Sequence, residues 1–287
     1  MNATPGSIDL HVHTTASDGG LAPGEVVARA AAAGVRVLSI TDHDTVAAYS
    51  GLDRRAHDIT LVPGIELSTY WRLIGVHVVG LGIDPDSTAM RDACASQQAA
   101  RERRARAIAA RLERAGIRDA YAGAARYAGE AAIGRPHFAR HLVACGAART
   151  LKQAYARFLR SPREVHGVVT CADLANVVAW IRSASGIAVL AQPAHYGLTG
   201  MRLDALAADF TACGGGGIEV VSGHQPAATT ARLAALARTH GLLGSVGSDF
   251  HHAERADTAL GRLPALPAGV EPVWGRWTAD TAPAAAP

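Results

Sequence analysis

Short apolar runs alternate with alanine-rich stretches along most of the chain. The apolar runs lie at residues 8–13, 35–40, 61–67, 76–81, 187–191, 217–221 and 242–246. Residues 23–33, 203–213 and 227–240 have the composition and spacing of helices. Continuous apolar strands that alternate with helices are typical of a mostly parallel sheet covered by helices. With this many repeats, we expect an α/β fold whose sheet closes, or nearly closes, into a barrel.

The middle of the chain departs from this alternation. From about residue 85 to residue 170 the pattern becomes helical, beginning with an Ala/Arg-rich stretch at 97–115. We therefore predict a first barrel part at 1–85, an inserted helical subdomain at 86–170 and a second barrel part at 171–277. The final residues, 278–287, are of low complexity and predict a disordered tail.

Composition and charge narrow the class of protein. Of the 287 residues, 49% are hydrophobic and 18% are charged, which excludes general disorder. The formal net charge of +3 permits an anionic ligand without requiring nucleic acid. The chain shows neither a signal peptide nor an apolar run long enough to cross a membrane, and its four cysteines are scattered. We expect a cytoplasmic protein, and nothing indicates a membrane or a protein partner.

Candidate metal ligands follow the predicted strands. The chain has thirteen histidines, and His11 and His13 point to the same side of the first strand because side chains in a strand alternate. Other imidazole and carboxylate groups lie in or after later strands, namely Asp18, His43, Glu66, His77, Asp249 and His251. Any one of them could be an ordinary core or loop residue. Together they predict a metal site, because barrels gather functional groups at strand ends and buried carboxylates need partners or metals.

The ordered set of these motifs resembles one known family. His11-x-His13, Asp18, Thr41-Asp42-His43, Gly64-x-Glu66, His77 and Gly247-Ser248-Asp249-x-His251 are similar to the motifs of the polymerase and histidinol phosphatase (PHP) family. The similarity covers residues 8–277. Residues 74–83, 134–143 and 267–274 resemble a narrower branch, which contains nucleoside 3′,5′-bisphosphate phosphatases and 5′→3′ exoribonucleases of the RNase AM type.

This resemblance implies a distorted PHP-type β/α barrel that holds two or three divalent metal ions. It implies a first site made by His11, His13, Glu66 and Asp249, and a second that shares Glu66 and adds His77. The third site would be made by Asp18, His43 and His251. Mixed imidazole and carboxylate ligands suit manganese, iron, zinc or magnesium, and the sequence does not choose among them. Glu219 is a candidate for a carboxylate that supports one of these ligands.

One ligand position departs from the family pattern. Relatives usually carry Ala-His-Pro-Gly-Arg after the strand at 187–191, whereas this chain has Gln192 in place of the histidine and His195 in place of the arginine. An amide oxygen is a weaker ligand than an imidazole for such ions. Three interpretations stay open: Gln192 binds the metal weakly, His195 substitutes for it, or the second site is empty.

The resemblance also implies residues that bind substrate. Arg135 and His137 lie in a segment that matches the branch, and guanidinium groups suit phosphate oxygens. Arg163 lies in a segment where relatives carry a lysine, and it is the candidate to keep that positive charge. The arginine-rich run at 101–114 also suggests nucleic-acid contact. We interpret it as a solvated helix face, because glutamates within it can pair with the arginines.

A metal-dependent phosphoesterase is the function that this pattern predicts. The expected substrate is a nucleoside 3′,5′-bisphosphate, cut at the 3′ position to give the 5′-monophosphate. Asp18 or Asp249 would orient the nucleophile, and His251 or His195 would donate a proton to the leaving oxygen.

Two alternatives stay open at this stage. One is a 5′→3′ exoribonuclease that acts on short 5′-phosphorylated RNA. The other is a metal-binding PHP barrel with impaired catalysis, because Gln192 is a substitution. An amidohydrolase-type barrel also begins with His-x-His, but it lacks the Thr-Asp-His motif of the second strand.

Overall fold

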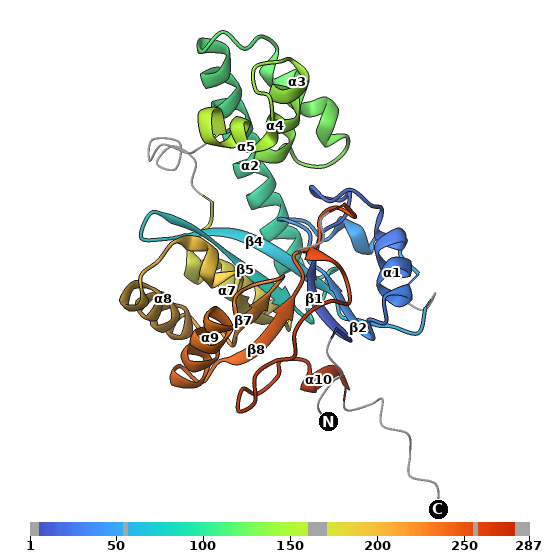
Figure 1. Ribbon diagram of the computed structural model, residues 1–287, viewed down its shortest axis with the longest axis vertical. Coiled ribbons are helices and arrows are strands. Elements are labelled where there is room, and N and C mark those ends of the chain that lie inside the picture. The colour runs from blue at the N-terminus through green and yellow to red at the C-terminus, as the bar shows by residue number, and fades with distance from the viewer. Residues whose placement is uncertain (1–5, 54–56, 160–170, 255–257, 279–287) are drawn as a thin grey trace, which may run out of the picture.

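The computed structural model describes residues 6–53, 57–159, 171–254 and 258–278 (Figure 1). Residues 8–61 contain a parallel sheet in the order β1 (Ile8–Val12), β2 (Val37–Ile40) and β3 (Thr60–Leu61), with helix α1 (Pro23–Ala32) between β1 and β2. Every residue of β1 and β2 is buried. Val26, Val27 and Ala30 of α1 pack in one core cluster with Leu38 and Ile40. Burial on both faces explains why these strands are mostly apolar, with Asp9, His11 and Ser39 as buried polar exceptions.

A second sheet contains the remaining strands in the order β4 (Gly64–Trp71), β5 (Ile74–Leu81), β6 (Ile187–Leu190), β7 (Gly217–Ser222) and β8 (Leu243–Gly247). Strands β6, β7 and β8 run parallel to one another. Helices α7 (Leu174–Ser183), α8 (Gly200–Ala212) and α9 (Ala227–Thr239) lie against this sheet (Figure 1). Their buried side chains, such as Val178, Phe210 and Leu233, share a core with Ile65 and Ile218 of the sheet.

The second sheet is mixed, which differs from the mostly parallel sheet that the alternation predicts. Strand β5 is antiparallel to both β4 and β6. The cause is a two-residue hairpin turn between β4 and β5, in which Arg72 and Leu73 have positive φ angles of 47° and 67°. Tight turns of this kind match the twist of antiparallel strands. The single strand predicted at 61–67 is also wrong, because β3 ends at Leu61 and β4 begins at Gly64.

The two sheets meet on both sides and form the distorted α/β barrel that the sequence predicts. On one side, the N–H of Asp249 donates to the carbonyl of His11 at 2.9 Å, which joins the end of β8 to β1. On the other, the N–H of Asp44 donates to the carbonyl of Glu66 at 2.9 Å, which joins the segment after β2 to β4. Both seams therefore bring predicted metal ligands from different sheets side by side.

Helices between β5 and α7 form a cluster beside the barrel. They are α2 (Thr88–Arg114), α3 (Ala120–Ala128), α4 (Arg135–Ala144), α5 (Leu151–Ala154) and the π-helical turn η2 (Tyr155–Leu159). Figure 1 shows α2 rising from the barrel, with α3, α4 and α5 gathered around its far end. This cluster has its own core, which includes Ile108, Phe138 and Leu142. The boundaries of the predicted parts at 85 and 170 stay predictions.

Three short helical segments complete the described chain: η1 (Ala47–Tyr49), η3 (Pro193–Tyr196) and α10 (Gly275–Thr278). Among the described residues, no helix combines the length and the apolar character that a membrane crossing needs.

Candidate metal centre

Imidazole groups in and just after β1 lie beside carboxylate groups of β4 and of the segment that follows β8. His11 and His13 are buried, and their Nε2 atoms lie 3.1 Å apart. Glu66 is also buried, and its Oε2 lies 3.4 Å from the Nε2 atoms of both histidines. Asp249 places Oδ1 3.4 Å from His13 Nε2. The four residues that the family resemblance implies for a first metal site therefore lie together.

Glu66 also faces two histidines from other elements. Its Oε2 lies 2.8 Å from Nδ1 of His43, which follows β2, and its Oε1 lies 2.8 Å from Nδ1 of His77 on β5. His43, Glu66 and His77 thus offer three ligand atoms within 4.8 Å of one another. The carboxylate of Glu66 is shared between this group and the group around His11, as a bridging ligand would be.

A third group surrounds Asp18. His251 Nε2 lies 3.3 Å from Asp18 Oδ1, and His43 Nε2 lies 3.9 Å from Asp18 Oδ2. The ring of His13 stacks on that of His251 with centroids 4.0 Å apart. His13, Asp18, His43 and His251 can therefore face one ion. The sequence implied Asp18, His43 and His251 for this site, and the structure adds His13.

The nitrogen and oxygen atoms of these groups fit divalent metal ions, because several of them are buried close together and yet make no hydrogen bond. His13 Nδ1, His43 Nδ1 and Glu66 Oε2 are buried and make no hydrogen bond, although the last two lie 2.8 Å apart. Unpaired buried polar atoms are costly, and a cation that these atoms face removes that cost. Nitrogen and carboxylate ligands in this mixture suit first-row divalent ions. Most of the predicted ligands can thus hold metal together, and Gln192 is treated separately below.

Burial and neighbouring charges set the protonation of these ligands. Burial, together with the positive charges of His251 and His43, lowers the pKa of His13 to about 3. Burial by itself would raise the pKa of Glu66, but His43, His77 and His11 outweigh it and hold this pKa well below its ordinary value. His13 and Glu66 are thus in the forms that bind metal, a neutral imidazole and an ionised carboxylate. Neighbouring carboxylates instead outweigh burial and raise the pKa values of three other candidate ligands, which must lose a proton when an ion binds: His11, His43 and His251.

Glu219 of β7 orients the first ligand, as the sequence suggested. Its Oε1 lies 3.0 Å from His11 Nδ1, and its Oε2 accepts a hydrogen bond of 2.7 Å from the backbone N–H of Gln192. Such a carboxylate fixes the tautomer of a ligating histidine, so that Nε2 points to the metal. Gly247 permits this arrangement, because a Cβ there would lie 2.2 Å from His11 Cβ and 2.5 Å from Glu219 Oε1.

A buried ion pair connects helix α2 to the segment that carries His43. Asp44 has a left-handed φ of 56° and accepts hydrogen bonds from Ser68 N at 2.7 Å and Ser68 Oγ at 2.8 Å. It also accepts from Gln97 Nε2 at 2.9 Å and from Arg101 Nε at 2.5 Å, both on α2. The interpretation of residues 101–114 as a solvated face is therefore wrong for Arg101, whose side chain is only 11% exposed.

Two other arginines of the same run line a cavity of about 370 Å³ next to the metal ligands. Its walls include Arg104, Arg111 and Arg135, together with His77 and Gln192. Arg104 donates to Cys171 Sγ at 3.0 Å, while its buried Nε has no hydrogen-bond partner. Burial, with the nearby charges of Arg104 and Arg101, lowers the pKa of Arg135. The sequence pattern suggested nucleic-acid contact for the run that contains Arg104 and Arg111 but favoured a solvated face, because helical periodicity does not show which end of a long helix meets the barrel.

The remaining predicted substrate residues lie at different places. His137 is buried in the first turn of α4, and its Nδ1 accepts a hydrogen bond of 2.9 Å from the N–H of Gly134. The proton of this ring is then on Nε2, since burial lowers the pKa of His137 to about 4. His137 borders a second cavity, of about 100 Å³, beside Asp18 and His43. Arg163 lies outside the described residues.

Gln192 lies at the edge of the metal centre, with a left-handed φ of 43°. It lines the 370 Å³ cavity beside His77 and His195. His195 is exposed in η3 and takes part in none of the ligand groups of the described chain. The positions leave all three interpretations of the second site open, and a substitution separates them.

We expect Gln192→His to raise the amount of metal bound at a fixed supply, because an imidazole binds such ions more strongly than an amide oxygen. The measurement is metal per chain by plasma mass spectrometry after gel filtration, together with the rate of phosphate-ester hydrolysis. His195→Ala is the companion variant, and it loses metal only if His195 itself is a ligand. Unchanged stoichiometry and rate in Gln192→His would contradict the expectation.

Comparison with known proteins places the chain among phosphate-ester hydrolases, although no family model matches it. It is 42% identical over 273 residues to the 5′-3′ exoribonuclease Rnm of Salmonella typhimurium, covering 94% of this chain and 93% of that protein. It is 38% identical over 271 residues to the 3′,5′-nucleoside bisphosphate phosphatase of Chromobacterium violaceum, covering 93% of this chain and 95% of the other.

Two solved structures are similar over nearly the whole chain. An amidohydrolase from Chromobacterium violaceum with bound sulfate and no metal has a TM-score of 0.87 and 38% identity, covering 95% of this chain and 96% of that one. A protein described as a metal-dependent phosphoesterase from Bifidobacterium adolescentis has a TM-score of 0.79 and 27% identity, covering 92% and 94%. The names of three of these four proteins describe hydrolysis of phosphate esters, and one of the three states that it depends on a metal.

Proposed function

The chain belongs to the PHP family of metal-dependent phosphoesterases, and on this premise we propose that it hydrolyses nucleoside 3′,5′-bisphosphates at the 3′ position. The observation that carries the proposal is the position of Arg104, Arg111 and Arg135 in a cavity that also contains the metal-centre residue His77. A substrate with one phosphate at the metal centre can place its second phosphate against these guanidinium groups. The buried Nε of Arg104, which has no protein partner, supports this role.

The ligands of the proposed centre are His11, His13, Asp18, His43, Glu66, His77, Asp249 and His251, with Gln192 as a weak additional ligand. Three groups of ligand atoms allow two or three ions, and manganese, iron, zinc and magnesium are the candidates. Bound divalent ions of this kind acidify water and neutralise charge on phosphoryl oxygens. Nucleotide or short RNA as substrate and a cytoplasmic location are parts of the same proposal.

The chain's own residues position the reacting groups. Water adds to the 3′ phosphorus, the bond between phosphorus and the 3′ oxygen breaks, and the 3′ oxygen takes up a proton. We assign orientation of the water to Asp18 or Asp249, and proton donation to His251 or His195. Arg135 and the two arginines of α2 hold the 5′-phosphate, which fixes the distance between the nucleoside and the reacting phosphate. His137 borders the opposite cavity and is a candidate for contact with the reacting phosphate.

A second candidate function is 5′→3′ exoribonuclease activity on short 5′-phosphorylated RNA. The similarity to the Salmonella exoribonuclease favours it, with 42% identity over nearly the full length of both chains. The two functions break the same bond, between phosphorus and a 3′ oxygen. They differ only in whether that phosphate carries a further nucleoside.

An assay with three substrates tests the proposal. Metal-loaded protein is incubated with adenosine 3′,5′-bisphosphate, with a 5′-phosphorylated oligoribonucleotide and with AMP. We expect inorganic phosphate and AMP from the bisphosphate, and no phosphate from AMP, since its only phosphate is the one that the arginines hold. The double variant His11→Ala, Asp249→Ala is the negative control. If metal is shown to be bound, but the bisphosphate gives no inorganic phosphate and the oligoribonucleotide gives no 5′-mononucleotide, the protein is a metal-binding barrel with impaired catalysis.

A further inference from the structure

Strands β5 and β6 separate at the place where the chain brings two residues of the predicted second metal site together. The last paired residues at this end of the two strands are Val78 and Leu190. The next two residues, His77 and Ala191, form only one of the two hydrogen bonds of a regular antiparallel pair, from Ala191 N–H to the His77 carbonyl at 3.1 Å. The N–H of His77 donates instead to the hydroxyl of Tyr196 at 2.9 Å.

The hydroxyl of Tyr196 lies between the two backbone groups that a regular pair would join directly. It accepts the hydrogen bond from His77 N–H and donates its own proton to the carbonyl of Ala191. A tyrosine hydroxyl can do both, because its oxygen carries a proton and also has lone pairs that accept. Two hydrogen bonds through this oxygen therefore replace one direct bond, and they hold the strands further apart at His77.

The peptide group between Ala191 and Gln192 is held at both of its ends. Tyr196 donates to its carbonyl, and its N–H donates to Glu219 Oε2 at 2.7 Å. Gln192 has a left-handed φ of 43°, which residues other than glycine seldom adopt, and the two bonds fix the backbone there. Tyr196 thus connects the backbone of His77 on β5 to the backbone of Gln192, which follows β6 directly.

We propose that Tyr196 is a positioning residue for the second metal site, where it sets the separation of His77 and Gln192. Nδ1 of His77 lies 2.8 Å from Glu66 Oε1, so a shift of the His77 backbone moves an imidazole relative to the carboxylate that two ligand groups share. Replacing a residue that orients a metal ligand typically costs roughly 10–100-fold in metal affinity. The inference rests on the metal centre of the proposed function, but it does not depend on which phosphate ester is the substrate.

Replacing Tyr196 with phenylalanine tests the inference, because it keeps the ring and removes only the hydroxyl. The N–H of His77 and the carbonyl of Ala191 then lose the partner that they share. In a calorimetric titration of the metal-free protein with Mn²⁺, we expect Tyr196→Phe to raise the Kd of one ion about 10–100-fold. The Kd values of the other bound ions should change less than twofold, which a general loss of structure would not allow.

Tyr121→Phe is the matched control. It removes a hydroxyl that donates to Glu102 within the helical cluster, at 2.8 and 2.9 Å from the two carboxylate oxygens, and it should change none of the Kd values. His77→Ala identifies the ion concerned, because Tyr196 acts through the position of His77. This variant should therefore weaken or remove the same ion that Tyr196→Phe weakens.

Three results overturn the inference: unchanged Kd values in Tyr196→Phe, an equal loss for every ion, or a loss at an ion that His77→Ala leaves unaffected. If the unsubstituted protein binds Mn²⁺ but leaves adenosine 3′,5′-bisphosphate intact, the proposed function is wrong, and the titration still decides the role of Tyr196. If it binds no Mn²⁺, the proposed metal centre and this inference are both wrong.

Discussion

Replacing Glu66 with glutamine should lower the hydrolysis of adenosine 3′,5′-bisphosphate by about 1,000-fold or more. Glu66 is the carboxylate that two ligand groups share, with Oε2 toward His11, His13 and His43 and Oε1 toward His77. The amide keeps the size of the side chain but removes its negative charge and one oxygen ligand. Loss of about 4 kcal/mol of transition-state stabilisation corresponds to this factor, since each 1.36 kcal/mol is tenfold in rate.

The measurement for Glu66→Gln is the bound metal per chain together with kcat/KM, at a metal supply that saturates the unsubstituted protein. We expect the variant to bind fewer ions and to remain folded by circular dichroism. Glu271→Gln changes an exposed glutamate in the same way and should alter neither quantity. Full metal content and full activity in Glu66→Gln would show that Glu66 is not a metal ligand.

Replacing Arg101 with methionine should destabilise the protein by about 3–5 kcal/mol, the usual cost of leaving one partner of a buried ion pair without the other. Asp44 is almost fully buried, and Arg101 contributes the charge that balances it at 2.5 Å. Burial by itself would raise the pKa of Asp44, but Arg101, together with the hydrogen bonds from Ser68 and the charge of His43, outweighs it and lowers this pKa, so the carboxyl is ionised in the native protein. Methionine fills a similar volume but leaves this charge without a counterion.

Urea unfolding of Arg101→Met and of the unsubstituted protein gives the two free energies of unfolding whose difference is predicted. Arg103→Met, at an exposed position of the same helix, is the control and should change stability by less than about 0.5 kcal/mol. Adding Asp44→Asn to Arg101→Met should recover part of the loss, because the unbalanced charge is then gone. Equal stability of Arg101→Met and Arg103→Met would show that the pair does not hold α2 to the barrel.

The hydrophobic pattern predicted most strands and helices of the barrel, because burial on two faces leaves a continuous apolar run in the sequence. It placed β5 correctly at 76–81 but missed the hairpin between β4 and β5, and its single strand at 61–67 joined the end of β3 to the start of β4. The turn of this hairpin is made by Arg72 and Leu73, residues that seldom adopt positive φ angles, so no turn signal marks the hairpin. Helix α7 (Leu174–Ser183) was also missed, although it is amphipathic, because it follows directly on the segment assigned to the insertion.

The candidate metal ligands could be predicted as a group because each of them lies in a strand or shortly after one, within a motif that resembles the family's. Barrel topology brings strand ends together, so His11, Glu66 and Asp249 had to lie close to one another once the strands were recognised. The supporting contacts could not be predicted in the same way. Glu219 reaches His11 across the two sheets, and Arg101 reaches Asp44 from a helix of the insertion. Neither pair is close in sequence, so no local pattern indicates it.

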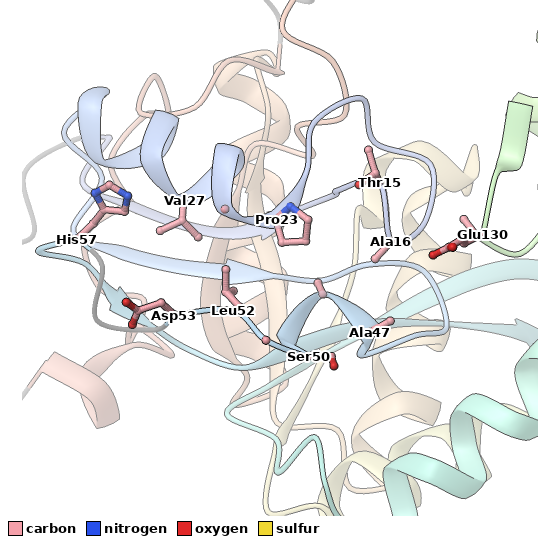
Figure 2. A pocket seen from close by; sticks show the side chains of 14 residues that line it. Thr15, Ala16, Pro23, Val27, Ala47, Ser50, Leu52, Asp53, His57 and Glu130 are labelled. Carbon is pink, nitrogen blue, oxygen red and sulfur yellow. The ribbon is translucent and has the colours of Figure 1, made fainter.

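The sequence by itself determined the barrel class, the family and the set of candidate metal ligands, because residue type and spacing carry that information along the chain. The tertiary structure decided which side chain belongs to more than one group of ligands, as the carboxylate of Glu66 does. It also decided that Arg101, Arg104 and Arg111 face the barrel and its cavity instead of solvent. Finally, it placed a groove along α1, with Pro23 and Val27 on one side and Ser50 and Leu52 on the other (Figure 2). These features depend on how distant segments pack against one another. The periodicity within one segment carries no information about that packing.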